Sequence, residues 1–335
     1  MTSFYSNAKS DIAGVAQGRA LDESSVRRMY EFAPYPDLGA DLKDMSLYLD
    51  VLEPQLEAII GKIRFLDVGC GTGHVLVGVA KRHPGWECCG IDLSEASLIV
   101  AAALADKHGV KVELRRGSYL DPLPFSEKFH VISAMGTIHH CADPVAALRN
   151  LKQYLEPSGF LLLHLYGMRA DHAKFDIKEC LSILEPDLTS YDQRFRYYDA
   201  LMKHQRRNWL KRLALTTPLD VYTIVRDWLR NLGRRRAGIS WSPPFDTRYR
   251  EVSAPWIDHF CHPCERAYEV SQVRELIELS GFRVVHMLKQ GRENHALIPP
   301  EWRERYERLD DWNKWRLSEL LAVGGGSFAM VLQRS

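Results

Sequence analysis

The sequence predicts an α/β fold: a seven-stranded doubly wound sheet with helical insertions that form a cap over the active-site edge. Short apolar segments alternate with helical segments between residues 63 and 166, and this alternation resumes near residue 271. A glycine-rich turn, Gly69 to Gly73, directly follows the first apolar segment. Alternation of this kind is typical of a parallel sheet that is covered by helices on both faces.

Seven segments have the apolar, β-branched composition of buried strands. The first five are predicted at 63–69, 87–93, 110–118, 129–136 and 159–166, the sixth within 281–290 and the seventh at 326–334. Helices are predicted between them, at 73–83, 94–109, 143–155 and 271–280. The seventh strand comes after a last helix-rich stretch and closes the predicted sheet.

The breaks in this alternation predict four parts. Residues 1–60 form an N-terminal lid and helix, and 61–167 form the Rossmann-like cofactor-binding core. Residues 168–265 carry helical patterns without a strand and are expected to form a substrate cap. Residues 266–335 complete the sheet, with a smaller helical insertion at about 299–323.

Composition excludes several classes of protein. Of the 335 residues 46% are hydrophobic and 26% are charged, with a formal net charge of +1, so wholesale disorder and a generally basic nucleic-acid-binding surface are not expected. Neither a secretory signal nor a membrane-spanning segment is predicted. Seven scattered cysteines indicate reduced thiols, and therefore a cytoplasmic protein.

The stretch "RFLDVGCGTGHV" places an acid, Asp67, beside three alternating glycines. Such a turn lets a ligand approach the main chain at the carboxyl end of a strand. The carboxylate of Asp67 disfavours a pyrophosphate, whereas Asp92 at the end of the second strand suits the two hydroxyls of a ribose. A ligand with a cationic amino-acid part and a ribose is S-adenosylmethionine. The alternative is a Rossmann-like domain that binds another nucleotide or has lost its cofactor.

Four segments then carry a family resemblance: "FLDVGCGTG", "GIDLSEASL", "GSYLDPLPF" and "FHVISAMGTIHHCADPVAALRNLKQYLEPSGFLLL". They resemble the successive motifs of class I S-adenosylmethionine-dependent methyltransferases, closely over residues 60–167 and loosely over 270–290 and 326–334. The resemblance implies a methyltransferase with S-adenosyl-L-methionine as cofactor. It also implies that the seventh strand runs antiparallel between the fifth and the sixth.

The resemblance further implies a set of cofactor-binding residues. The methionine part of the cofactor would lie against Asp67, Gly69, Gly71 and Gly73. Asp92 would bind the ribose, with Leu93 packed on the adenine, and Ala134 would lie near the donor methyl group. Many members have an acid near position 118, where this chain has Ser118. The hydrogen bond to the adenine amino group is then expected from Ser118, Tyr119 or the main chain.

Two histidines, His139 and His140, follow the fourth strand where the methyl acceptor is expected. Histidine is a suitable base at neutral pH if the acceptor must lose a proton, so His139 is the candidate catalytic residue. His140 is a candidate substrate contact, and the alternative for either is a structural hydrogen bond to the main chain. In "MYEFAPYP", Tyr30 is expected to stack on the cofactor and Tyr35 to contact substrate in a lid. The alternative is an ordinary surface turn.

The segment "DHFCHPCERAY" contains Cys261-x-x-Cys264 with nearby histidines. A closed zinc site needs four ligands, and no second pair at suitable spacing is present, so no metal is expected. Substrate contacts from His262 and Tyr268, with Arg266 beside them, are favoured instead.

The predicted function is methyl transfer to an O, N or S atom of a small molecule, as in secondary metabolism. The alternative acceptor is a protein side chain or RNA, for which the basic and aromatic motifs at 194–198, 204–212 and 230–236 would supply a surface. These motifs equally fit a solvated helical face, so nucleic acid is not the expected partner. A non-catalytic cofactor-binding subunit is the third interpretation, which turnover by the isolated chain would exclude.

Overall fold

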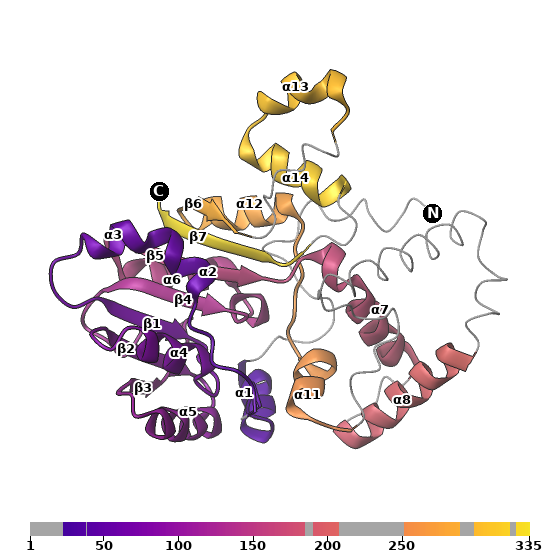
Figure 1. Cartoon of the computed structure of the whole chain (residues 1–335). Helices are drawn as coiled ribbons and strands as arrows, with labels where there is room; N and C mark the ends of the chain where they lie inside the picture. Colours follow the sequence, from indigo (N-terminus) through magenta and orange to yellow (C-terminus); the bar gives the residue numbers. More distant parts are fainter. Residues whose placement is uncertain (1–22, 38, 185–189, 208–250, 289–297, 322–325) are drawn as a thin grey trace. The chain divides into compact units, whose positions relative to one another are not determined.

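The computed structural model describes residues 23–37, 39–184, 190–207, 251–288, 298–321 and 326–335 (Figure 1). The chain divides into two compact units. The first takes in the chain up to residue 172 and from residue 262 onward, and the second is formed by residues 173–261.

The first unit contains the predicted seven-stranded sheet (Figure 1). Its strands are β1 (Arg64–Val68), β2 (Glu87–Asp92), β3 (Glu113–Arg116), β4 (Phe129–Met135), β5 (Leu155–Leu165), β6 (Phe282–Met287) and β7 (Phe328–Arg334). They lie in the order β3-β2-β1-β4-β5-β7-β6. The first five strands are parallel, whereas β7 runs antiparallel to both β5 and β6. The predicted seven-stranded α/β sheet and its antiparallel seventh strand are therefore confirmed.

Helices cover both faces of this sheet. The α-helices of the first unit are α1 (Glu23–Phe32), α2 (Ser46–Leu49), α3 (Glu53–Glu57), α4 (His74–Arg82), α5 (Glu95–His108), α6 (Pro144–Gln153), α12 (Val270–Leu279), α13 (Arg303–Glu307) and α14 (Asp311–Leu321). Short 3-10 helices are η1 (Asp50–Leu52), η2 (Ile138–His140) and η4 (Pro300–Trp302). None of the helices in the described residues is long and apolar enough to cross a membrane.

Local sequence explains where the helices beside the site begin and end. Ser94 caps α5 by accepting a hydrogen bond from the Ser97 N–H, and Asp143 caps α6 by accepting one from the Ala146 N–H. Gly109 ends α5 in the left-handed conformation that favours glycine. These caps place the first turns of both helices at the carboxyl edge of the sheet.

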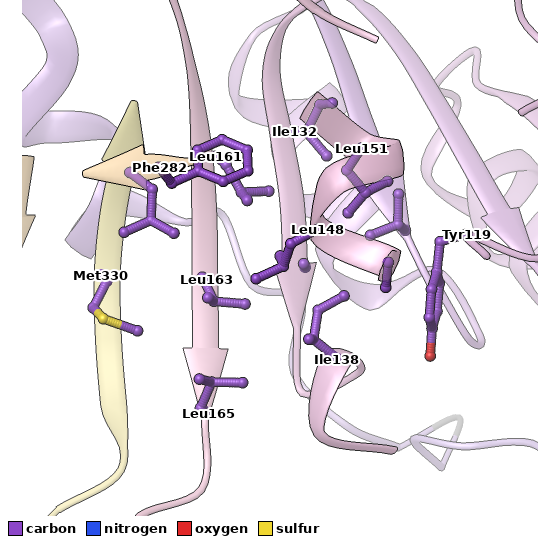
Figure 2. Close-up of a cluster of buried hydrophobic side chains, with 14 of the residues drawn as sticks. Tyr119, Ile132, Ile138, Leu148, Leu151, Leu161, Leu163, Leu165, Phe282 and Met330 are labelled. Carbon is purple, nitrogen blue, oxygen red and sulfur yellow. The ribbon is translucent and has the colours of Figure 1, made fainter. Parts of the chain in front are cut away.

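The core of the first unit lies on the two faces of the sheet. On one face, Leu148 and Leu151 of α6 point toward Ile132 of β4 and the leucines of β5 (Figure 2). Helix α12 packs in the same cluster. On the other face, α2, α3 and α4 pack against Phe65, Val131 and Leu162. Burial of two apolar faces holds the strands in register and so fixes where their ends lie.

The second unit has an aromatic core of its own. Its described elements are α7 (Met168–Leu184), within which the unit boundary falls, α8 (Tyr191–Arg207) and α11 (Ala254–Cys261). Tyr198 lies 4.7 Å from Phe260, and Phe195 lies 5.0 Å edge-on to Trp256, ring centroid to ring centroid. Phe195 and Tyr198 therefore pack as core and do not form a base-stacking surface. Residues 208–212 and 230–236 of the other basic motifs lie outside the described residues.

Candidate functional site

The site lies where the strand order of the sheet reverses. Strands β1 and β4 are neighbours, but the chain leaves β1 toward β2 on one side and β4 toward β5 on the other. In doubly wound sheets ligands bind beyond the carboxyl ends of the strands at this point. The glycine turn follows β1, Asp92 ends β2, and the two histidines of η2 follow β4. The structure thus brings the predicted cofactor and acceptor residues to one edge.

The glycine turn is shaped by close contacts with other parts of the chain. Gly69, Gly71 and Gly73 have φ values of 62°, 52° and 83°. A Cβ atom on Gly69 would overlap the Thr137 side chain, and one on Gly71 would overlap the Tyr35 carbonyl oxygen. The Thr72 N–H also donates to the Tyr35 carbonyl at 3.1 Å. The segment around Tyr35 therefore touches this turn through its main chain, a contact that the sequence did not predict.

We expect Gly71→Ala to destabilise the first unit by about 3 kcal/mol. The left-handed φ costs an L-residue about 1–2 kcal/mol, and the added Cβ must also displace the Tyr35 carbonyl. Gly109→Ala is the matched control, since Gly109 has a φ of 66° and a Cβ atom there would meet no other atom within 4 Å. Urea unfolding measures both losses, and equal losses would mean that Tyr35 does not press on the turn.

Asp92 holds the turn and also faces the site. One carboxylate oxygen accepts from the Gly71 N–H at 2.8 Å, and the other accepts from the Ser94 N–H at 2.9 Å. Burial raises the pKa of Asp92, and both N–H donors oppose that rise. A carboxylate offers about four lone-pair sites, so each oxygen can accept a further bond. Because Asp92 is only half-buried, these residues fit a ribose with both hydroxyls bound.

Helix α1 contributes two carboxylates beyond the ends of β2 and β3. Glu31 accepts from the Glu95 and Ala96 N–H groups in the first turn of α5, at 2.8 and 3.1 Å. Glu23, eight residues earlier in the same helix, accepts from the Ser118 hydroxyl at 2.6 Å. The sequence shows that position 118 is not an acid. It does not show that the Glu23 carboxylate lies beside Ser118. No local pattern could have shown this contact, which joins residues distant in the chain.

The Asp67 side chain is buried, although its expected role is to lie against the methionine part of the cofactor. It is buried in β1, between Gly90 of β2 and Ser133 of β4 in the register of the sheet. Burial raises its pKa to about 7, the Asp92 carboxylate adds to the rise, and Lys43 opposes it. Asp67 is therefore a buried carboxyl group that a positive charge at the glycine turn would favour in its ionised form.

Three histidines gather beyond the ends of β4 and β5; His139, His140, His262 and the neighbouring Tyr166 are called the histidine cluster below. The His140 and His262 rings stack at 3.8 Å with 24° between their planes. The buried His139 ring lies 4.2 Å from the His140 ring and 4.0 Å from the Tyr166 ring. The structure therefore brings His262 to the two predicted histidines from a segment more than 100 residues away.

The segment around residue 264 is fastened to the loop after η2. The Arg266 guanidinium donates to the carbonyls of Cys141 and Ala142, and the Arg266 N–H donates to the His139 carbonyl at 3.0 Å. The Cys264 thiol donates to the Cys141 carbonyl at 3.4 Å. Arg266 and Cys264 therefore have a structural role: their hydrogen bonds hold His262 beside His140.

The remaining candidates are placed as follows. Tyr30 lies with its ring 5.7 Å from that of His262, so it borders the histidine cluster. The Tyr119 hydroxyl donates to the Thr137 carbonyl at 3.2 Å. Tyr268 is buried in the apolar core, and its main chain bonds to Tyr166 and Met168. Leu93 is half-buried directly after Asp92, and Ala134 is buried in β4.

Comparison with known proteins agrees with this geometry. A family model described as a methyltransferase domain matches residues 66–161. A ubiquinone biosynthesis O-methyltransferase of Marinobacter nauticus is 31% identical over 208 residues, which are 59% of this chain and 83% of that protein. An uncharacterized protein of Synechococcus sp. is 26% identical over 281 residues, which cover 82% of this chain and 61% of that protein.

Other relatives are matched over less of their length. A ubiquinone biosynthesis O-methyltransferase of Actinobacillus pleuropneumoniae is 32% identical, over 34% of this chain and 50% of its own length. The chain thus spans about half the length of several curated relatives that it matches. Among solved structures, PKMT2 from Rickettsia typhi in complex with AdoHcy has a TM-score of 0.67 at 16% identity. The match covers 90% of this chain and 55% of that one, and it shows the fold.

The match to the Marinobacter nauticus protein, over most of that protein's length, shows the family. The methyltransferase model covers the strands and turns that carry the glycine turn, Asp92 and the histidines of η2. The predicted family is thereby confirmed. The chain belongs to the class I S-adenosylmethionine-dependent methyltransferases.

Proposed function

We propose that this chain transfers the methyl group of S-adenosylmethionine to an O, N or S atom of a small molecule. The observation that carries the proposal is the pairing of Asp92 with the glycine turn at the strand-order reversal. Asp92 would bind the ribose, Leu93 would pack on the adenine, and the first turn of α4 would meet the methionine part. When bound, the cofactor supplies an electrophilic methyl group.

The residues around this site position the reactants. Methyl transfer from a sulfonium is an in-line displacement, for which holding two atoms at the right distance and angle supplies much of the rate. The main chain of the glycine turn and Asp92 would orient the donor, while the loop after β4 would orient the acceptor. Glu23, beside Ser118, is suited to accept a hydrogen bond from the adenine amino group.

A small-molecule acceptor is supported by the relatives named as ubiquinone biosynthesis O-methyltransferases. Residues 168–265 are proposed to form the substrate cap, and 1–60 the lid. A protein or RNA acceptor is the alternative. All seven cysteines lie in the described part of the chain, and none of them forms a disulfide, which supports the proposed cytoplasmic location.

Isothermal titration calorimetry of the purified chain tests the proposal. We expect S-adenosylmethionine and S-adenosylhomocysteine to bind with one site per chain, because both carry the ribose and the amino-acid part. NAD is the matched control, since its pyrophosphate would lie at the glycine turn beside the Asp67 carboxylate, and we expect no binding. Absence of heat with S-adenosylmethionine, or equal affinity for NAD, would contradict the proposed function.

A further inference from the structure

We infer that Glu31 is a positioning residue for the methyl donor: by bonding helix α1 to α5, it holds Glu23 where the adenine is expected to bind. The inference rests on the proposed function and deepens it, because it makes the docking of α1 and the binding of the donor two linked equilibria. Glu31 itself does not touch the ligand in this scheme. The observations that carry it are the bonds between α1 and the rest of the first unit, and the place of each along the helix.

The segment that follows α1 is bonded to the glycine turn. The Tyr35 carbonyl accepts from the Thr72 N–H at 3.1 Å, and the Pro36 carbonyl accepts from the Thr72 hydroxyl at 2.8 Å. The Thr72 hydroxyl oxygen also lies 2.9 Å from Nδ1 of His74, in the first turn of α4. Because Thr72 and His74 are buried, water competes little for these bonds. Helix α1 therefore ends close to a fixed point at the turn.

The helix itself has little buried surface. Of the ten residues of α1, all of which are described, only Met29 is buried. A helix of this length is marginally stable alone in water, so α1 depends on contacts with the rest of the unit. Two of these contacts are the carboxylates of Glu31 and Glu23, near its two ends. Docking of α1, defined here by these two contacts, is therefore an equilibrium that a few hydrogen bonds can shift.

Glu31 bonds α1 to the start of α5. The first four N–H groups of a helix have no partner within it. Ser94 takes the one on Ser97, and the Glu31 carboxylate takes those on Glu95 and Ala96 at 2.8 and 3.1 Å. The helix dipole adds to this attraction, since a negative charge is favoured at a helix N-terminus. Glu31→Ala would remove both bonds without weakening α1 itself, because alanine has the highest helix propensity.

Glu23 lies near the other end of α1, beside the loop after β3. The Gly117 N–H donates to the Asp92 carbonyl at 3.0 Å, so this loop begins directly beside the end of β2. A nucleoside whose ribose is bound by Asp92 would therefore place its base near Ser118. One oxygen of Glu23 accepts from the Ser118 hydroxyl at 2.6 Å, and the carboxylate has further lone pairs for the adenine amino group. Docked α1 is the conformation that supplies this acceptor.

The two contacts are linked because they belong to one helix. While Glu31 is bonded to α5, Glu23 is held at Ser118, whereas a helix that leaves α5 takes the adenine acceptor with it. A ligand that binds more tightly to the docked form must favour docking by the same factor. Glu31 thus raises the affinity for the donor through the population of the docked form. Docking also places Tyr30, whose ring centroid lies 5.7 Å from that of His262, at the acceptor side.

Hydrogen exchange of the full chain, followed by mass spectrometry, tests the linkage without a variant. Saturating S-adenosylhomocysteine should slow exchange of the main-chain N–H groups of α1 and of the first turn of α5 by about fivefold or more. Helix α3 is the internal control and should not change. In Glu23→Ala the ligand should still bind through Asp92, but exchange in α1 should no longer respond. Bound ligand without protection of α1 in the wild type, or with equal protection in Glu23→Ala, would overturn the inference.

Calorimetry on a double-mutant cycle separates positioning from direct contact. We expect Glu31→Ala to weaken binding of S-adenosylhomocysteine about fivefold. Glu95→Ala is the matched control, since it removes the same charge from the same helix end but keeps the main-chain N–H bonded to Glu31, and it should leave the affinity unchanged. In the Glu23→Ala background, Glu31→Ala should cost less than about twofold. Equal losses in both backgrounds, or no loss in either, would contradict the linkage.

Failure of the inference and failure of the proposed function give different results. If S-adenosylhomocysteine binds the wild type but neither α1 nor the Glu31→Ala variant responds as expected, the linkage through α1 is wrong and the methyltransferase proposal stands. If neither S-adenosylmethionine nor S-adenosylhomocysteine binds, the proposed function itself fails. The exchange measurement on the wild type decides the linkage even where a variant folds poorly.

Discussion

Asp92→Ala is expected to lower the affinity for S-adenosylmethionine by at least about 100-fold. Each hydrogen bond from a ribose hydroxyl to the carboxylate is worth about 1.5–3 kcal/mol, and two are lost together. Since about 1.4 kcal/mol corresponds to a tenfold change, the loss reaches two orders of magnitude. Calorimetry with the wild type and the variant measures it.

A second ligand distinguishes a direct contact from a distorted turn. Asp92 also accepts from the N–H groups of Gly71 and Ser94, so its removal disturbs the protein as well. The 2′-deoxy form of S-adenosylhomocysteine should bind the wild type at least tenfold more weakly than the parent ligand. In Asp92→Ala the two ligands should bind equally. A penalty for the missing hydroxyl that persists in the variant would contradict the ribose contact.

Asp67 is expected to make the folded protein less stable as pH rises from about 4 to about 7. Burial raises its pKa from 3.8 to about 7, so in this window the folded chain holds a proton that the unfolded chain releases. The free energy of unfolding therefore falls with rising pH. This difference in pKa between the folded and unfolded chain corresponds to a loss of ~4 kcal/mol in the free energy of unfolding. The loss is complete above pH 7, where Asp67 is ionised in both states.

Asp67→Asn replaces the titrating group with a neutral one of the same shape. Urea unfolding between pH 4 and pH 8 should show a flatter profile for this variant than for the wild type. Asp106→Asn, at an exposed position of α5, is the matched control and should reproduce the wild-type slope. Parallel profiles for the wild type and Asp67→Asn would show that Asp67 ionises as it does in water.

The fold could be predicted from sequence because its determinants are local and periodic. Buried strands are short apolar runs, and a glycine turn followed by a helix marks the first crossover. The antiparallel seventh strand followed from the family resemblance and not from spacing. Asp92 could also be predicted from sequence, because an acid at the end of the second strand of a doubly wound sheet is placed to bind a ribose.

The contacts that complete the site carry no such local signal. Glu23 and Ser118 are joined by one hydrogen bond between distant parts of the chain, and either residue alone resembles an ordinary surface position. His140 and His139 likewise have different surroundings, since Nδ1 of His140 lies 3.1 Å from the carbonyl oxygen of Cys264, more than 100 residues later in the chain. Neighbouring identical residues cannot be distinguished by type, only by the main-chain atoms that their rings meet.

The place of β7 between β5 and β6 has a consequence for how the chain is made. Within the described sheet β6 pairs only with β7, which follows it by about forty residues in the chain. During translation β6 and its helix α12 have no partner strand, although β1 to β5 already have theirs. The nascent protein can thus pair β1 to β5 early, whereas β6 can join the sheet only after β7 has also been synthesised.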